Sequence, residues 1–312
     1  MSRTLRAVHT VTDIEEPVRI DSYLCDVVRI MTRSQLSRRE ARFFVGSQEV
    51  KASRKVRSGD QVTLLYQELP ELELHPEQMD LDIIYEDERI LAVNKPAGIV
   101  VHPGAGNFEG TLIHGVLNHC RELKQRFPEA QHRPGIVHRL DKDTSGVIVF
   151  AKDPEAHEHL ARQFHDRTTS KTYSAVLRGV LQKKRGTIHD RIVRDPRNRK
   201  RFISVDAGSA RGREAISSYL VLRQMECAAL VRLTPVTGRT HQLRVHMKTL
   251  GHPIINDPVY GSAGEDLLLL HASSIRFAHP DGSALCLRAP LPERFSRYIR
   301  SFGAAPPLTV RD

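Results

Sequence analysis

The sequence predicts an α+β protein with a mixed, largely antiparallel sheet and a small αβ domain at its N-terminus. Three observations predict this class. Short apolar runs rich in β-branched residues outnumber helical segments, the two kinds of segment show no regular βαβ alternation, and an acidic stretch with prolines interrupts the chain. The 312 residues are enough for about two domains, and 40% of them are hydrophobic, enough for a buried core.

The expected N-terminal domain covers residues 15–75 and is strongly basic. Its compact part, residues 17–66, has ten basic and five acidic residues. Its expected elements are a helix marked by Ile20, Leu24 and Val28, a second helix through Arg38–Val45 capped by Ser34 or Ser37, and short strands over Val45–Val50 and Asp60–Tyr66. On these features alone, a generic basic αβ domain remains open.

An acidic linker is expected at residues 76–82. It belongs to a stretch, residues 67–80, with five acidic residues, two prolines and no Lys or Arg. A larger domain is expected over residues 83–300, followed by a loose tail at residues 301–312. Its predicted strands are Ile83–Tyr85, Ile90–Asn94, Val147–Ala151, Tyr173–Leu177 and Ala228–Leu233, and its predicted helices are Thr111–Asn118 and Glu155–Arg167.

The composition restricts the partners and the location of the protein. Its net charge of +10 favours a polyanionic partner, because neutralising phosphates releases counterions; positive charge that serves only solubility is the alternative. The four cysteines have no paired spacing, which is typical of reduced thiols and argues against a cysteine-based zinc site. Without a long apolar run or a secretory signal, a cytoplasmic location with no membrane contact is expected.

The polar run His138–Gly146 lies between two apolar runs. Polar groups at the end of a buried strand serve either a functional site or satisfied structural hydrogen bonds. On extended backbone, Arg139, Asp141 and Asp143 project to one side, and Gly146 permits a close backbone approach. The residues alone leave two interpretations open, a structural ion-pair cluster and a catalytic carboxylate.

The same run, His138-Arg-Leu-Asp-Lys-Asp-Thr-Ser-Gly146, resembles the signature of the large-subunit ribosomal pseudouridine synthases. Further motifs resemble those of this family, in the family's order: Asn94-Lys-Pro-Ala-Gly98, Lys171-Thr-Tyr173, Thr237-Gly-Arg-Thr-His-Gln-Leu-Arg-Val-His246, Gly251-His-Pro253, Asp257-Pro-Val-Tyr-Gly261, Leu270-His-Ala272 and Ala289-Pro-Leu-Pro292. Several motifs in order are far more specific than one. The chain is identified as a member of the family.

The resemblance implies roles for individual residues. Asp141 matches the catalytic nucleophile, Arg139 the arginine that helps hold the flipped-out site, Tyr173 the active-site tyrosine, and Arg244 the arginine that pairs with the aspartate. The segment His102–Asn107 and the attached N-terminal domain are most similar to those of the D-type enzymes, which modify several uridines in one helix-loop of 23S ribosomal RNA. Further residues expected to bind RNA or assist base flipping are His138, Thr144, Arg239, His241, Gln242, Arg38, Arg39 and Arg42.

Arg244 has an expected structural setting. Thr240 can cap a helix that carries Arg244 and ends at Gly251. Burial raises the pKa of an aspartate and a nearby arginine lowers it by about 1–3 units, so Arg244 is expected to offset the desolvation of Asp141 and fix its rotamer. A solvated helix charge is the alternative for Arg244.

The N-terminal domain resembles the RNA-binding domain of ribosomal protein S-four, through Arg19-Ile-Asp-Ser-Tyr-Leu24, a Ser-Arg-rich second helix and a hairpin that closes on Ser58-Gly-Asp60. Together the resemblances imply ribosomal RNA as the partner, in an assembling large subunit, and we expect a monomer. The basic segment Arg191–Arg213 is predicted to be a phosphate-contacting loop or hairpin, with a solvated charge run as the alternative.

No cofactor is expected, because isomerisation of uridine consumes no electrons, phosphate or group donor. No metal is expected either: His241 and His246 lie five residues apart, about 140° round a helix, so they do not share a face. For the aspartate, attack on the ribose, attack on the base and charge stabilisation of a sugar intermediate all remain open.

Two other functions fit some of these residues. Asp141 with Asp143 could serve a carboxylate-dependent hydrolase of nucleosides or glycosides, but that function leaves the basic N-terminal domain without a role. A ribosome-binding protein that has lost catalysis is the other, and the intact set of Asp141, Tyr173 and Arg244 argues against it.

Overall fold

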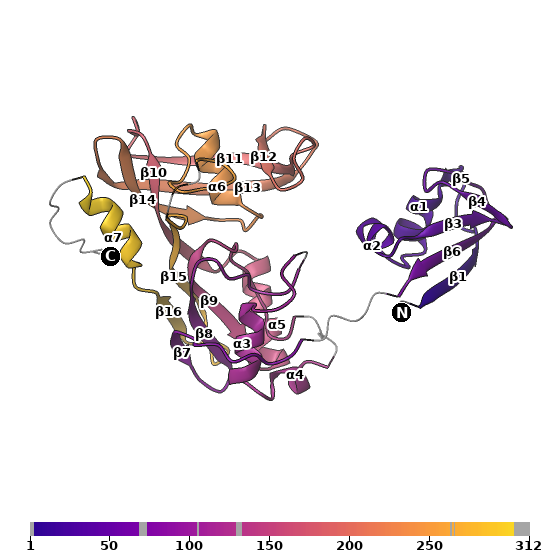
Figure 1. Ribbon diagram of the computed structural model, residues 1–312, viewed down its shortest axis with the longest axis horizontal. Helices are drawn as coiled ribbons and strands as arrows, with labels where there is room; N and C mark the ends of the chain where they lie inside the picture. Colours follow the sequence, from indigo (N-terminus) through magenta and orange to yellow (C-terminus); the bar gives the residue numbers. More distant parts are fainter. Residues whose placement is uncertain are drawn as a thin grey trace. The chain divides into compact units, whose positions relative to one another are not determined.

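The structure, a computed structural model, describes residues 3–68, 74–104, 106–128, 133–262, 264 and 266–302 (Figure 1). The chain divides into two compact units, Met1–Leu72 and Glu73–Asp312. Most of the tail expected at residues 301–312 lies outside the described residues. Within the described ranges, no helix is long and apolar enough to cross a membrane.

The first unit has a four-stranded antiparallel sheet in the order β1-β6-β3-β4 and a two-stranded sheet, β2-β5. Its elements are β1 (Thr4–Thr10), β2 (Val18–Arg19), α1 (Ile20–Ser22), a π-helical turn over Tyr23–Val27, α2 (Arg33–Arg38), β3 (Arg42–Val45), β4 (Gln48–Val50), β5 (Lys55–Val56) and β6 (Gln61–Gln67). β1 pairs along its whole length with β6. The unit therefore begins well before residue 15, the boundary expected from the sequence.

The second helix of this unit differs from the expected one. α2 begins after Thr32, whose hydroxyl accepts the N–H of Gln35 at 3.3 Å while Gln35 Oε1 accepts the N–H of Thr32 at 2.7 Å. This reciprocal cap replaces both expected serine caps. The expected helix through Arg38–Val45 is wrong, because Arg42–Val45 form β3, where Phe43 is buried in the core of the unit.

The segment expected as an acidic linker packs on the second unit. Leu74 is 2% exposed and belongs to the core of that unit. Glu77 Oε2 accepts the N–H of Gly110 at 2.9 Å, and the Glu77 N–H donates to the carbonyl of His114 at 3.1 Å. Residues 76–82 thus belong to the packed unit, because the glutamate finds partners there.

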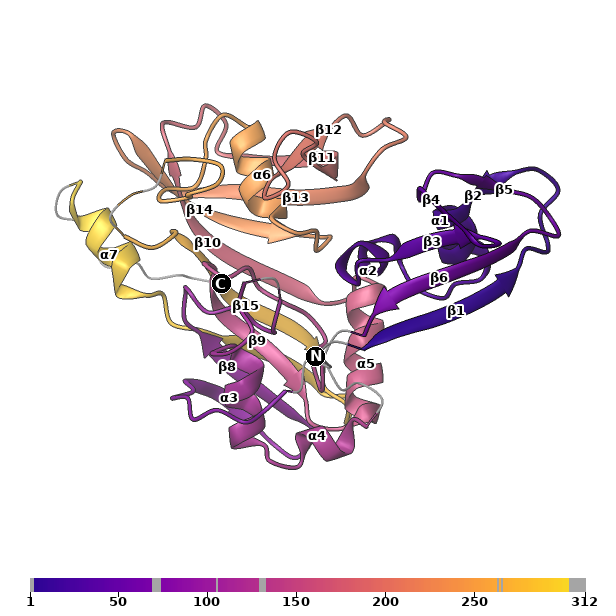
Figure 2. The ribbon, with the colours of Figure 1, turned by 45° about the vertical axis from the view of Figure 1, so that its right-hand side comes forward.

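The second unit has a ten-stranded sheet in the order β12-β11-β13-β14-β10-β15-β9-β8-β7, with β16 paired to β15 (Figure 1 and Figure 2). Its strands are β7 (Ile83–Glu86), β8 (Ile90–Lys95), β9 (Ser145–Ala151), β10 (Ser170–Arg178), β11 (Arg185–Arg194), β12 (Phe202–Val205), β13 (Arg213–Gln224), β14 (Ala228–Pro235), β15 (Leu270–Ala278) and β16 (Ala284–Arg288). Its helices are α3 (Leu112–His119), α4 (Leu123–Arg126), α5 (Pro154–His165), α6 (Gln242–Thr249) and α7 (Glu293–Arg300). The described pairings are antiparallel except that of β15 with β9, which confirms the predicted fold class.

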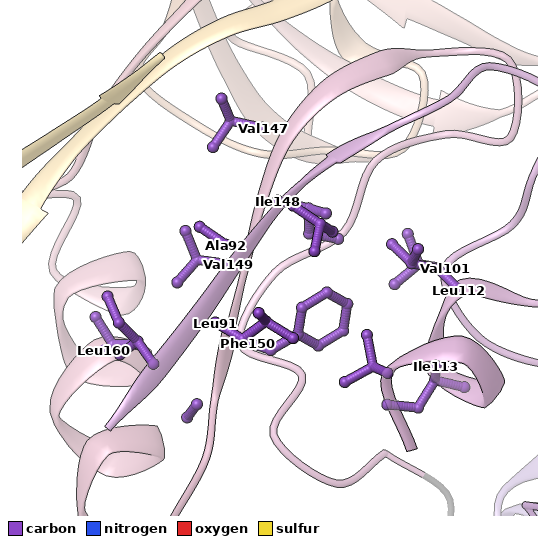
Figure 3. Close-up of a cluster of buried hydrophobic side chains, with 14 of the residues drawn as sticks. Leu91, Ala92, Val101, Leu112, Ile113, Val147, Ile148, Val149, Phe150 and Leu160 are labelled. Atoms are coloured by element: carbon purple, nitrogen blue, oxygen red, sulfur yellow. The ribbon is translucent and has the colours of Figure 1, made fainter. Parts of the chain in front are cut away.

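β8 and β9 are covered on both faces. In Figure 3, Phe150 of β9 points toward Ile113 of α3, whereas Val149 points toward Leu160 of α5 on the other side. Burial on both faces explains why β9 is an uninterrupted apolar run. At its start, Gly146 has φ of 116°, and an added Cβ would lie 2.2 Å from a backbone oxygen of β15. The close approach predicted for this glycine is confirmed.

The other end of the sheet carries α6. Leu243 and Met247 of this helix pack with Leu177 of β10 and with apolar residues of β14 in a second core. The helix begins after His241 rather than at the expected Thr240 cap, and His241 has a left-handed φ of 57°. β10 and β15 contribute residues to both cores. These two strands therefore join the two ends of the sheet.

Candidate active site

A cleft of about 780 Å³ is lined by the loop that precedes β9, by the start of β10 and by the loop between β14 and α6. The motifs that are far apart in the sequence thus meet in one place. Nine of the twelve predicted site residues line this cleft: Asp141, Arg244, Tyr173, Arg139, His138, Thr144, Arg239, His241 and Gln242.

Asp141 lies at the end of the extended segment before β9. A turn follows it, in which the Thr144 N–H donates to the Asp141 carbonyl at 3.2 Å. The Asp141 carboxylate is 25% exposed, and its Oδ2 lies 3.6 Å from Nη1 of Arg244. The turn breaks the extended path on which the expectation for Asp143 rested, and Asp143 does not line the cleft. Asp141 is the one carboxylate among the described residues that line the cleft.

Arg244 is held from behind by Asp257, a residue to which the sequence analysis gave no role. Arg244 Nε and Nη2 donate to the two oxygens of Asp257 at 2.8 and 2.8 Å, and the side chains are 3% and 0% exposed. Burial acts against the Asp257 charge, but Arg244 and the N–H groups of Val259 and Tyr260 hold its pKa below the usual value. The sequence did contain a signal for this partner, the aspartate that opens the motif from Asp257 to Gly261, because a buried arginine requires a counter-charge.

Tyr260 and His241 complete this support. The Arg244 guanidinium carbon lies 5.2 Å from the centroid of the Tyr260 ring. The Tyr260 hydroxyl oxygen accepts the N–H of Phe202 at 2.9 Å and lies 2.8 Å from His241 Nδ1. His241 has φ of 57°, a conformation that non-glycine residues rarely adopt and that the surrounding contacts must therefore stabilise.

Tyr173 is half-buried in the cleft wall. It follows a register shift in the pairing of β10 with β15, between Thr172 and Tyr173, where the extra residue, Ser273, belongs to β15. Burial, with the negative charge of Asp141, raises the pKa of Tyr173 well above its usual value. Its hydroxyl therefore keeps its proton at neutral pH.

Lys95 supports the backbone beside Asp141. The side chain is fully buried, and Nζ donates to the carbonyls of Pro96, Ile99 and Lys142 at 2.8, 2.8 and 3.0 Å. These three acceptors match the three donors of an ammonium group. Burial lowers the pKa of Lys95 to about 7, against the opposing effect of nearby carboxylates. The buried lysine anchors the residue that follows Asp141.

A comparison with known proteins gives the family. Residues 89–249 match the RNA pseudouridylate synthase family. The chain belongs to this family. An uncharacterized RNA pseudouridine synthase of Chlorobaculum parvum is 40% identical over 305 residues, which cover 91% of this chain and 93% of the relative. The ribosomal large subunit pseudouridine synthase D of Borreliella burgdorferi is 38% identical over 309 residues, which cover 96% of this chain and 94% of the relative.

Solved structures agree with the sequence relatives. Human RNA pseudouridylate synthase domain containing 1 is 26% identical, with a TM-score of 0.54, and the match covers 78% of this chain and 100% of that one. Human RNA pseudouridylate synthase domain containing 4 is 25% identical, with a TM-score of 0.55, covering 70% and 92%. The protein is therefore an RNA-modifying isomerase, as the motifs predicted.

Several arginines of this pseudouridine synthase lie at the mouth of the cleft. Arg139 Nη2 donates to the hydroxyl of Thr240 at 2.8 Å. Arg239 Nε donates to the carbonyl of Glu214 at 2.9 Å, and Arg167 pairs with the carboxylate of Glu214 at 3.0 Å. These contacts orient the arginines and leave further donors for a ligand, because each guanidinium carries five N–H groups.

His138 lies in the wall of the cleft with its ring packed against protein. Nε2 accepts the N–H of Val149 at 2.9 Å, and the ring stacks on Phe164 with centroids 4.7 Å apart. Burial, with the charge of Lys171, lowers the pKa of His138 to about 3. The imidazole is neutral and fixes the strand end, so its predicted RNA contact remains a prediction.

Gln242 and Thr144 are similarly buried. Gln242 is 4% exposed; its Oε1 accepts the hydroxyl of Thr237 at 2.7 Å, and its Nε2 donates to Ile216 O and Ser217 Oγ at 3.0 and 2.9 Å. Thr144 is 2% exposed. These bonds hold the loop before α6 in shape, and direct contact of either side chain with RNA is untested.

The basic segment over residues 191–213 contains a hairpin, as predicted. β11 pairs with β12 from Arg191 opposite Val205 to Arg194 opposite Phe202. Because Phe202 donates to Tyr260, the hairpin is joined to the residues behind Arg244. Its contact with phosphates remains a prediction.

The predicted arginines of the N-terminal domain lie in the first unit. The Arg39 guanidinium carbon lies 5.6 Å from the ring centroid of Tyr66, and Arg42 Nε donates to Glu49 at 2.9 Å. Arg42 lies on β3 rather than on the expected helix. The side chain of Arg38 lies outside the described residues. Their role in RNA binding stays a prediction.

In the described part of the chain, Glu86, His119 and Cys120 bring three metal-ligating atom types together. The Glu86 oxygens are already occupied, because Lys152 Nζ lies 2.8 Å from one and His119 Nε2 lies 2.7 Å from the other. None of these residues lines the cleft. The group is explained by its internal ion pairs.

Proposed function

We propose that this pseudouridine synthase acts on uridines of large-subunit ribosomal RNA, the 23S molecule, with Asp141 as its nucleophile. The observation that carries the proposal is the Asp141 carboxylate, 25% exposed in the cleft, with a nearly fully buried Arg244 behind it. Relatives from Borreliella burgdorferi and Neisseria meningitidis are named ribosomal large subunit pseudouridine synthase D, which supports this RNA class and D-type target sites.

The nitrogen atoms of the Arg244 guanidinium contact two different carboxylates, which supports the assignment of Asp141. Asp257 takes Nε and Nη2 of Arg244, which leaves Nη1 as the group nearest Asp141. Arg244 thus orients the carboxylate without saturating it. In the proposed reaction the bond from ribose to the ring nitrogen breaks and the base turns. A ring carbon then bonds to the ribose, loses its proton and leaves the nitrogen protonated. The carboxylate assists by covalent attack or by charge, and the proposal includes no metal or organic cofactor.

The target uridine must leave its stack to reach the cleft, at a cost of a few kcal/mol. We propose that Arg139, at the exposed mouth, fills or caps the vacated space and that Tyr173 offers its ring to the uracil. The N-terminal domain then serves as an S-four-like RNA-binding module. Its ten basic against five acidic residues over residues 17–66 suit phosphate contacts. The proposed substrate is an assembling large subunit, and the proposed acting form is a monomer.

Mapping pseudouridines in ribosomal RNA from cells with and without this protein tests the proposal. The expected result is loss of a few pseudouridines within one helix-loop of 23S RNA. Wild-type protein should restore them, Asp141→Asn should not, and Asp143→Asn, the matched control, should restore them. Identical maps with and without the protein, or changes confined to other RNAs, would contradict the assignment.

A further inference from the structure

Lys171 is an ammonium group in the catalytic cleft that the roles above leave unused. It lies on β10, two residues before Tyr173, and lines the cleft together with it. Its Nζ lies 5.7 Å from the ring centroid of Phe164. An added Cβ at Gly238, in the loop before α6, would lie 4.0 Å from the same Nζ. The ammonium group therefore reaches from β10 toward the opposite wall of the cleft.

Lys171 differs from the other cations of the cleft. Arg139, Arg167 and Arg244 each hold a protein oxygen within 3.0 Å. Among the described residues, the ammonium group of Lys171 has no hydrogen-bond or ion-pair partner. Burial alone lowers its pKa. A contact with an aromatic ring is worth about 0.5–1 kcal/mol at an exposed site and about 2 kcal/mol when desolvated, so it offsets only part of the several kcal/mol that desolvating an ion costs.

We propose that Lys171 binds a phosphate group of the RNA, that of the nucleotide whose base lies at Tyr173. The inference rests on the proposed function. Two residues along a strand span about 6.6–6.8 Å, comparable with the reach from a nucleobase to the phosphate of its own nucleotide. The mouth nearby carries Arg139, Arg167 and Arg239, and Asp141 is the one acid among the described lining residues. The electrostatics of this corner therefore suit an anion.

The first test compares Lys171→Met, which keeps the apolar stem, with Lys171→Arg, which keeps the charge, and with Lys183→Met, an exposed lysine outside the cleft. The probe is an unmodified 23S transcript. Lys171→Met is expected to weaken binding by roughly 10- to 150-fold, as for a lost hydrogen bond to a charged group. It should also make the log–log salt slope shallower by about 0.7, with the loss in KM rather than kcat. Lys171→Arg should recover most of the affinity, and Lys183→Met should behave as wild type.

A second test distinguishes a phosphate contact from a base contact. A short RNA with one neutral methylphosphonate linkage, placed in turn on either side of the converted uridine, is titrated against wild type and Lys171→Met. One linkage should weaken wild type as much as the substitution does and should have no added effect on the variant. Additive losses at both linkages, or an unchanged salt slope in Lys171→Met, would overturn the inference while wild-type turnover still stands. If the wild type forms no pseudouridine either in the transcript or in 23S RNA of an assembling large subunit, the proposed function itself fails.

Discussion

The floor and the rim of the cleft hold their charges in opposite ways. The floor, Arg244 with Asp257, is a bidentate pair whose side chains are 3% and 0% exposed. The rim, Arg139, Arg167 and Lys171, is open to ligands: its arginines keep unused donors, and the ammonium group of its lysine has no polar partner in the described part of the chain. The difference predicts that the floor is organised when the chain folds, whereas the proposed RNA contacts would complete the rim.

The energies of the two regions should differ accordingly. Removing one partner of a buried ion pair costs about 3–5 kcal/mol, because a charge is left uncompensated. Exposed pairs are worth about 0–1 kcal/mol. Changes to the floor should therefore reduce stability and turnover together, whereas changes to the rim should weaken RNA binding and its dependence on salt.

The largest effect on turnover is expected from replacing Asp141, the carboxylate that the floor supports. Asp141→Asn should abolish isomerisation, on the order of 10⁴-fold or more as for the loss of a nucleophile, because the amide carries no charge. Its affinity for RNA should stay within a few-fold of wild type, since phosphate contacts elsewhere dominate binding. Single-turnover pseudouridine assays and a binding titration measure the two quantities.

Asp143→Asn is the matched control for this substitution. It changes the same atoms two residues away, outside the lining of the cleft, and should be far milder. Equal losses in the two variants, with folding intact, would favour the paired-carboxylate hydrolase. Wild-type turnover by Asp141→Asn would sink the nucleophile assignment.

The next effect is expected within the floor. Asp257→Asn keeps the shape of the side chain but removes the bidentate counter-charge of the buried Arg244, which leaves only the more distant Asp141 at 3.6 Å. Unfolding by urea should show a loss of about 3 kcal/mol, the low end for a broken buried pair because the amide still accepts one hydrogen bond. Turnover should fall with it, since Arg244 no longer holds its orientation toward Asp141.

Glu158→Gln serves as the control for Asp257→Asn. Glu158 pairs with Arg162 on the surface of α5, with side chains 74% and 67% exposed, so its loss should cost at most about 1 kcal/mol. If both variants lose the same small amount of stability, the floor is no more tightly organised than the surface, and the comparison between floor and rim fails.

The sequence predicted β7, β8, β9, β10 and β14 of the second unit because each contains a short apolar run, but it did not predict β13, β15 or β16. It missed β1 because Thr4–Thr10 alternates exposed and half-buried positions, so no apolar run marks it. It placed the second helix over Arg38–Val45 rather than Arg33–Arg38, because pairing of Arg42–Val45 with β6 outweighs the local preference for a helix. The local sequence pattern was sufficient to predict strands that are fully buried. It was insufficient where pairing with a distant strand determines the secondary structure.

The same limit applies to the site: residues in continuous motifs could be predicted, and partners that only the fold brings close could not. Asp141 was found because its motif is continuous in the chain, and Arg244 because its own motif is equally dense. The partner of Arg244 was missed because Asp257 lies 13 residues further along, and only the fold brings it behind α6. Lys95 was missed because nothing in its local sequence indicates that an ammonium group is fully buried among carbonyls.

Tyr173 lies between floor and rim, and two substitutions separate its roles. Tyr173→Ala should weaken engagement of the flipped uridine by roughly 5- to 150-fold, the value of one base–aromatic stack. Tyr173→Phe keeps the ring and should bind normally; a loss of turnover in this variant would assign the hydroxyl to proton transfer or to orienting Asp141. If both variants match wild type, Tyr173 serves only packing.

The pH dependence sharpens the assignment of the Tyr173 hydroxyl. Because burial and the Asp141 charge raise the pKa of Tyr173 above its usual value, the proton is retained to higher pH than on a free tyrosine. The kcat of wild type should therefore show no fall between about pH 8 and about pH 10 from loss of this proton. A fall there that is absent from Tyr173→Phe would contradict the raised pKa.

The smallest effect on turnover is expected from removing the first unit. The cut belongs after residue 72, because Leu74 is buried in the core of the second unit and must stay. Every residue of floor and rim remains, so isomerisation at saturating RNA should survive, while selectivity among uridines should degrade. If the removed unit makes three to five phosphate contacts, the log–log salt slope should fall by roughly 2 to 3.5 units. An unchanged slope would mean that the first unit does not touch RNA. The truncated protein could also lose all turnover at saturating RNA while still unfolding cooperatively. That result would mean that the first unit helps to build the cleft, so that RNA binding and catalysis could not be assigned to separate parts of the chain.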